Sequence, residues 1–306
     1  MYHIKSKGGV FMDDRSFLLR IHLCAGIGIK GETKIYNFMQ QNKRQPQVTE
    51  LDKILTGTKS DLQHFLADFH STSTTQKMLV NQRHNGIITI LDPEYPTQLK
   101  ETFEPPIILF YQGNLSLMKE PSLAVVGARK MTSYGADVLP SVLKDVCTPQ
   151  IPIVSGAATG VDSLAHRLAL KAHAPTIAVI GTGLDQTYPK DNYELQASIA
   201  KKGLVLSEYE IGQKPLPYHF PLRNRIIAGL CYSLLVVEAK HHSGSLITAN
   251  LALQENRNVL AIPGRIDSSL SVGCNELIQA GAKPVLNSRD ILEDFPNSLT
   301  NQSSKA

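Results

Sequence analysis

The sequence contains no tryptophan, only four cysteines and no long hydrophobic run. Cys24, Cys147, Cys231 and Cys274 are far apart and form no CxxC pair. A structural zinc site normally needs such spacing, and nothing in the pattern resembles a disulfide framework, so we expect neither a bound metal nor disulfides. Because no apolar run approaches the ~18 residues that cross a bilayer, we also expect no membrane segment.

The two ends of the chain are polar. Residues 1–9 lack the apolar core of a signal peptide, so we expect the protein to stay in the cytoplasm. Residues 1–12 and 297–306 are predicted to be a disordered extension and a disordered tail. Met12 is an alternative start to Met1 on this interpretation.

Strong excess charge is also missing. The formal net charge is +4, so any nucleic-acid surface has to be a local patch rather than the whole molecule. Basic residues do cluster locally, at Arg129-Lys130, Lys201-Lys202 and Arg223/Arg225.

Residues 13–70 have the pattern of short helices. Phe17, Leu18, Ile21 and His22 recur at helical spacing, and glycines or polar stretches interrupt the helical periods that follow. We therefore predict a small helical module, similar to a SAM-like domain. The segment 71–86 is predicted to be a linker, in part helical.

From residue 87 to 296, short apolar runs alternate with helical stretches. Most of the later runs are apolar throughout, which is typical of strands buried on both faces of a parallel sheet. The alternation predicts an α/β, doubly wound, mostly parallel sheet of the Rossmann type. The expected strands are 87–90, 107–111, 123–126, 151–154, 176–180, 204–207, 233–237, 259–262 and 284–286.

Glycines, hydroxyl residues and basic residues follow these strands, at the edge where parallel sheets bind ligands. Glycine allows close approach of the backbone, helix N-termini favour anions, and arginine grips phosphate with two donors. Because several loops share these features, the edge is suited to a polyanion. Asn224 between Arg223 and Arg225 favours a shaped loop, and Asp162, Asp185 and Glu208 are expected to support loops.

Several enzyme signatures are missing. The first strand–helix turn reads GARKMTSYG rather than GxGxxG, and there is neither a GxxxxGK[ST] loop nor a GxSxG elbow. We therefore expect a binding protein with no cofactor rather than an enzyme. Tyr188, Tyr209, Tyr218 and Phe220 lie near the rim and are candidates for stacking on bases.

Seven segments in order resemble the DprA/Smf family of DNA-processing proteins, over about residues 90–290. They read VGARKMTSYG, SGAATGVDSLAH, AVIGTGLDQTYPKDN, SEY, FPLRNRIIAGL, VVEAKHHSGSLITANLALQENRNVLAIPG and GCNELIQAGA. The resemblance implies an extended Rossmann domain that protects incoming single-stranded DNA, loads RecA recombinase during natural transformation, and forms homodimers.

The resemblance also implies particular DNA-binding residues. The arginine of the VGxR loop is Arg129, and the lysine of the YPxxN loop is Lys190. Further residues in matching loops are Ser155, Gly156, Arg223, Asn224, Ser243 and Ser245. Many family members carry a C-terminal winged-helix domain, for which this sequence has too few residues after the sheet.

Two other interpretations remain. The first is a nucleotide phosphoribohydrolase of the lysine decarboxylase-like type; the corresponding loop HHSGSLITANLALQE lacks the double glycine, and Glu255 comes late for the catalytic position. The second gives Gly26-Ile27-Gly28 a phosphate-holding role like that of a helix–hairpin–helix, although such glycines usually only make turns.

Overall fold

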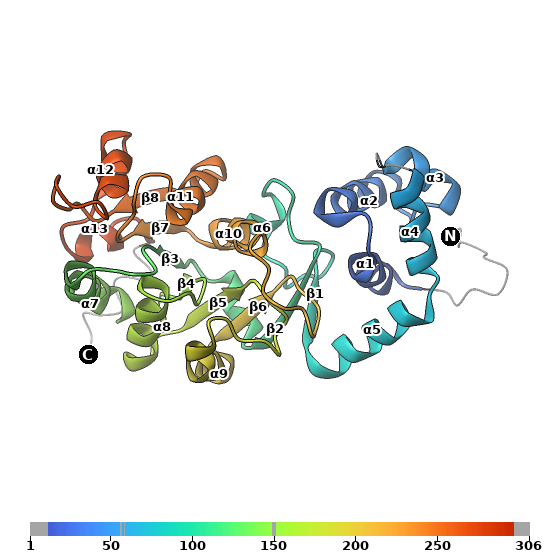
Figure 1. The fold of residues 1–306 in the computed structure, drawn as a ribbon, viewed down its shortest axis with the longest axis horizontal. Helices are drawn as coiled ribbons and strands as arrows, with labels where there is room; N and C mark the ends of the chain where they lie inside the picture. The colour runs from blue at the N-terminus through green and yellow to red at the C-terminus, as the bar shows by residue number, and fades with distance from the viewer. Residues whose placement is uncertain (1–11, 56, 58, 149–150, 297–306) are drawn as a thin grey trace.

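The computed structural model describes residues 12–55, 57, 59–148 and 151–296. The two predicted disordered ends, apart from Met12, lie outside the described residues. The molecule is elongated, with a helical module at one end and a larger sheet domain at the other (Figure 1). Over the described residues, no helix combines the length and the apolar character needed to cross a membrane.

The described residues of the helical module form five helices. Helix α1 starts after Asp13, whose Oδ1 accepts a hydrogen bond from the Ser16 amide at 2.9 Å. The segment 71–86, predicted as a partly helical linker, is mostly helix α5. Ser71 caps that helix, and α5 contacts α1. The helices are α1 (Asp14–Leu23), α2 (Gly28–Asn42), α3 (Val48–Ile54), α4 (Lys59–Phe69) and α5 (Thr72–His84).

Nine strands of the described chain form one sheet, close to the nine predicted apolar runs. In space their order is β1-β2-β6-β5-β4-β3-β7-β8-β9. The first two strands are antiparallel to their neighbours, and the other seven are parallel. The strands are β1 (Gly86–Thr89), β2 (Ile108–Gly113), β3 (Leu123–Val126), β4 (Ile153–Ser155), β5 (Thr176–Ile180), β6 (Leu204–Ser207), β7 (Ser233–Val236), β8 (Asn258–Ala261) and β9 (Lys283–Pro284).

Helices cover both faces of this sheet, with α7, α8 and α9 on one side and α10, α11 and α12 on the other (Figure 1). Strand β3 serves both layers, because Leu123 and Val125 belong to one hydrophobic cluster while Ala124 and Val126 belong to the other. The helices are α6 (Thr97–Lys100), α7 (Ser133–Cys147), α8 (Val161–Lys171), α9 (Tyr193–Lys202), α10 (His219–Leu230), α11 (Gly244–Gln254), α12 (Val272–Gln279) and α13 (Ser288–Leu292), with 3₁₀ turns η1 (Leu115–Lys119) and η2 (Lys190–Asn192).

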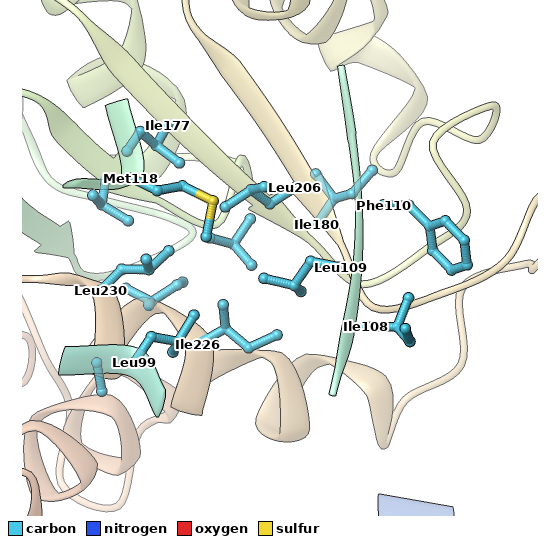
Figure 2. Packing of buried hydrophobic residues seen from close by; sticks show 14 of the residues in the cluster. Leu99, Ile108, Leu109, Phe110, Met118, Ile177, Ile180, Leu206, Ile226 and Leu230 are labelled. Atoms are coloured by element: carbon cyan, nitrogen blue, oxygen red, sulfur yellow. The ribbon is translucent and has the colours of Figure 1, made fainter. Parts of the chain in front are cut away.

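The helical module shares its hydrophobic core with part of the sheet domain. Phe17 and Phe65 of the module belong to the same buried cluster as Phe110 of β2. Figure 2 shows the sheet-domain part of this cluster, where side chains from β2, β5 and β6 meet side chains from α10. The two regions are therefore joined by apolar packing as well as by the chain.

The order of the strands creates a switch point beside β3. The chain winds outward from β3 through β4, β5 and β6, then returns to β7 on the other side of β3 and winds the opposite way. Loops that leave the carboxyl ends of β3 and β7 therefore diverge toward opposite faces. In doubly wound sheets this divergence opens a crevice for ligands.

Candidate nucleic-acid interface

A groove of about 950 Å³ lies at this switch point. One side is made by the loop after β3, which carries Arg129 and Lys130. The other is made by the loop after β7 and the start of α11, which together carry Lys240 to Ser245. The first two turns of α10 supply further wall and floor. The first and last of these segments lie more than 90 positions apart in the sequence, and only the sheet topology brings them together.

Arg223 forms part of the floor of the groove. The side chain is buried, with the residue only 5% exposed. Its Nη1 donates to the carbonyl oxygen of Gly156 at 2.6 Å and to the carbonyl oxygen of Val179. Burial, with a further contribution from the Arg129 charge, lowers the pKa of Arg223 to about 10, so the guanidinium stays charged at neutral pH.

Ser155 and Gly156 lie beneath the groove and support Arg223. The Ser155 hydroxyl is fully buried and donates to the Val125 carbonyl at 2.6 Å, which ties β4 to β3. A Cβ at Gly156 would collide with the Arg223 guanidinium, so glycine is what allows that side chain to lie flat on the loop. Both residues therefore shape the site from below and do not line it.

Arg129 stands on the exposed rim of the groove. Its Cζ lies 5.7 Å from the ring centroid of Phe220, the second residue of α10. The ring of Phe220 in turn lies 5.3 Å from that of Tyr188, centroid to centroid. A cation and two aromatic rings from three different segments thus form one continuous wall.

The opposite wall is the start of α11. Ser243 is the residue that precedes the helix, and its Oγ lies 2.9 Å from the Oγ of Ser245. The first turn of a helix leaves amide N–H groups without intrahelical acceptors, and its dipole favours anions. Lys240 adds a positive charge on this side, next to the exposed and closely packed rings of His241 and His242.

The segment around Arg223 does not form the shaped loop that was predicted. Arg223, Asn224 and Arg225 all lie within helix α10, which tolerates Pro221 because that proline is in the first turn. Successive helical residues point in different directions, so the basic pair is split. Asn224 lines the groove beside Arg223, whereas Arg225 pairs with Glu208 at 2.5 Å.

Lys190 is exposed but does not line the groove. It begins η2, two residues after Tyr188, which does line it. Of the eight residues expected at the site, the structure therefore brings five to the groove, two beneath it, and one just beyond its edge. The five are Arg129, Arg223, Asn224, Ser243 and Ser245.

The three carboxylates expected to support loops do so. Asp162 accepts a hydrogen bond from the Ala158 amide at 3.3 Å, and burial raises the pKa of its carboxyl group. Asp185 accepts from the Gly212 amide at 2.9 Å. Glu208 is held by Arg225, so it does not present an unpaired negative charge to the groove.

Comparison with known proteins decides the family. The model of a family described as DNA recombination-mediator protein A matches residues 86–296. The DNA processing protein DprA of Streptococcus pneumoniae is 52% identical over 68% of this chain and 73% of its own length. The chain belongs to the DprA/Smf family. DprA of Bacillus subtilis is 40% identical over 72% of this chain and 75% of its own length.

Solved DprA structures share the fold. The X-ray structure of DprA from S. pneumoniae matches 93% of this chain and 99% of its own, with a TM-score of 0.85 and 40% identity. A Helicobacter pylori DprA structure, whose subject is that protein's mode of binding single-stranded DNA, matches 70% of this chain and 98% of its own, with a TM-score of 0.62 and 30% identity. The predicted Rossmann-type α/β fold is confirmed.

Lys240, His241 and His242 were not among the residues predicted for the DprA/Smf site. Both histidines are exposed and line the groove. The signal that could have found these residues was their position, because they directly follow a buried strand and precede a Ser-Gly-Ser helix start. Their chemistry alone did not distinguish them from surface residues.

Proposed function

We propose that this protein binds single-stranded DNA along the switch-point groove, protects it and loads RecA recombinase onto it in the cytoplasm, as a homodimer. The observation that carries the proposal is the combination of exposed Arg129, Lys130 and Lys240 with the start of α11 around one groove. These groups offer charge and amide donors to several phosphates at once. The H. pylori relative that binds single-stranded DNA supports the choice of ligand.

A salt-titrated mobility shift tests DNA binding. Single-stranded oligo-dT should bind more tightly than a duplex of equal length, and affinity should fall as salt rises because phosphate contacts release counterions. Arg129→Glu should weaken binding by roughly 10- to 100-fold and reduce the salt dependence. Lys190→Glu should weaken it less, since Lys190 lies beyond the groove.

A charge-matched control separates the loss of a contact in the groove from a general effect of added negative charge. Lys171→Glu changes an exposed lysine at the end of α8, the end of that helix away from the groove, and should leave affinity unchanged. Wild-type affinity in both Arg129→Glu and Lys190→Glu would remove the groove as the binding site. For the recombinase step, the protein should speed RecA assembly on strands coated with single-strand-binding protein, and Arg129→Glu should not.

The phosphoribohydrolase alternative gains no support from the position of Glu255. This residue follows α11, at the opposite end of the helix from Ser243, and its Oε1 accepts a hydrogen bond from the Phe103 amide at 2.9 Å. It is therefore directed away from the groove. Release of adenine from AMP by the purified protein would reinstate the enzyme hypothesis.

The proposal of a phosphate-holding turn at Gly26-Ile27-Gly28 also gains no support from its surroundings. Gly26 and Gly28 have positive φ, as a tight turn between α1 and α2 requires. The neighbouring Ala25 amide donates to the Asp68 carboxylate at 2.9 Å. A phosphate at this turn would meet that negative charge, so we keep the proposed DNA contact within the sheet domain.

A further inference from the structure

The two walls of the groove diverge from neighbouring strands, and a buried side chain connects them. Strands β3 and β7 stay paired as far as the Val237 amide, which donates to the Val126 carbonyl at 3.1 Å. Beyond that point the loop after β3 carries Arg129 toward one wall, and the loop after β7 carries Lys240 toward the other. Glu238 lies where the two loops separate, directly after Val237, and only 2% of it is exposed.

The Glu238 carboxylate binds the far end of the Arg129 loop. Its Oε1 accepts a hydrogen bond from the Thr132 hydroxyl at 2.5 Å, and its Oε2 accepts one from the Thr132 amide at 2.8 Å. Thr132 precedes α7, and its hydroxyl oxygen also accepts from the Gly135 amide at 3.4 Å. A Cβ at Gly135 would lie 2.7 Å from the Glu238 Oε2, so glycine leaves room for the carboxylate against the first turn of the helix.

The negative charge of Glu238 is engaged outside the groove. The carboxylate accepts hydrogen bonds at the amino end of α7, where the helix dipole favours an anion. Glu238 is not among the described residues that line the groove. Release of Thr132 would leave a buried carboxylate without these donors, which is costly, so the pair of hydrogen bonds fixes the position of Thr132.

The Arg129 loop is held at both ends. At its start, the Ala128 carbonyl accepts a hydrogen bond from the Val161 amide at 3.2 Å. At its end, the buried carboxylate holds Thr132. Only three residues separate these two points, and Arg129 and Lys130 are exposed among them. A basic side chain on a loop that is already fixed loses less conformational freedom when it binds a phosphate.

We propose that Glu238 is a positioning residue for the DNA site. Through Thr132 it fixes the loop that presents Arg129 and Lys130 at a set separation from the Lys240 wall, so that both walls contact one strand together. This inference rests on the proposed function, which it deepens. Glu238 itself does not contact the DNA.

Two substitutions weaken this connection to different extents. Glu238→Ala removes both hydrogen bonds, and Thr132→Val removes one. Glu238→Ala should weaken oligo-dT binding roughly 5- to 20-fold and lower the salt dependence by about one phosphate contact, because the loop no longer presents its two cations together. Thr132→Val should weaken binding less, and since it keeps the Glu238 charge, its loss cannot come from a change of charge. Thr132→Ser restores the hydroxyl and should restore binding.

A double-mutant cycle distinguishes positioning from a general loss of structure. In a protein that already carries Arg129→Ala and Lys130→Ala, Glu238→Ala should cause little further loss, since the residues that it positions are gone. Glu255→Ala is the matched control for a carboxylate that holds a backbone amide away from the groove, and Ser71→Ala is the control for a lost helix cap in α5. Both controls should bind oligo-dT as the wild type does.

Wild-type or tighter oligo-dT binding by Glu238→Ala, shown to be folded by circular dichroism, would overturn the positioning role. Tighter binding is what a nearby negative charge with no other role would give on removal. An equal loss with and without the Arg129 and Lys130 substitutions would also overturn it. If Glu238→Ala does not fold, equal affinities of Thr132→Val and Thr132→Ser would do so. Failure of the wild type to bind oligo-dT would instead remove the proposed function itself.

Discussion

The helical module (Asp14–His84) and the sheet domain (Gly86–Leu292) each hold a cation whose side chain is largely buried, and the surroundings of the two cations differ. In the sheet domain Arg223 lies against backbone carbonyls under the groove, with its nearest charge influences from Asp162 and Arg129. In the module His22 lies against the Glu32 carboxylate at 2.9 Å, and its Nε2 donates to the Glu208 carbonyl at 2.7 Å. His22 thus bridges the two regions.

The two buried cations are therefore expected to have different roles. Arg223 shapes the candidate DNA site, so stability and the proposed DNA binding are both expected to depend on this side chain. Among the described residues that line the groove, all belong to the sheet domain, so His22 is expected to affect stability alone. Three substitutions and one pH experiment test that distinction.

Arg223→Met should have the largest effect and should affect both properties. It leaves the Gly156 and Val179 carbonyls without their donor, and Asp162 without its nearby positive charge, at a cost of about 3 kcal/mol or more in the free energy of unfolding. Oligo-dT affinity should fall at least tenfold. Denaturant unfolding and binding assays check both, with the exposed Arg167→Met on α8 as the control.

His22→Leu should lower stability without changing DNA binding. The substitution leaves Glu32 buried without its partner and removes the donor to the Glu208 carbonyl, which should cost about 3 kcal/mol at pH 7. Oligo-dT affinity, measured well below the unfolding transition, should stay within twofold. The exposed His64→Leu on α4 is the control, and a marked loss of affinity in His22→Leu would show that the module acts on the groove.

The contribution of His22 should depend on pH. Burial by itself lowers the pKa of His22, but the Glu32 carboxylate and then Glu208 outweigh it and raise the value from 6.5 to about 9. The folded state therefore binds the proton more tightly than the unfolded state, so this stabilisation is complete below pH 6.5 and is lost as pH rises through 9. The stability difference between wild type and His22→Leu should shrink by about 2 kcal/mol between pH 7 and 9.

Lys77→Met should have the smallest effect. Lys77 pairs with Glu210 at 2.9 Å across the same junction, but the two side chains are 38% and 25% exposed. Exposed pairs contribute about 0.5 kcal/mol, because water already solvates both charges. A loss of stability comparable to that of His22→Leu would contradict the view that burial makes the difference at this junction.

The sequence allowed most of the fold to be predicted. Each of the nine expected strands corresponds to an observed strand, because runs such as Leu123–Val126 are apolar throughout and buried on both faces. Segments whose residue pattern is mixed could be assigned only in part. Thr72–His84 is polar enough to suggest a linker, and its helical state depends on the Ser71 cap and on packing against α1.

The site could be predicted only in part. Arg129, Ser243 and Ser245 follow buried strands, and parallel topology places such positions at one edge. The sequence did not reveal that Arg223 lies within a helix, that Gly156 lies beneath its guanidinium, or that Arg225 turns away to Glu208. Each of these depends on distances between segments that are far apart in the chain.

Residue types alone specify the strands, the glycine-rich turns after them and therefore a ligand-binding edge, because burial and turn formation are local preferences of each residue type. Which side chains share the groove depends on the fold. The return of the chain to β7 beside β3 places the Arg129 loop opposite the start of α11. That juxtaposition depends on strand order, which no single segment of the sequence encodes.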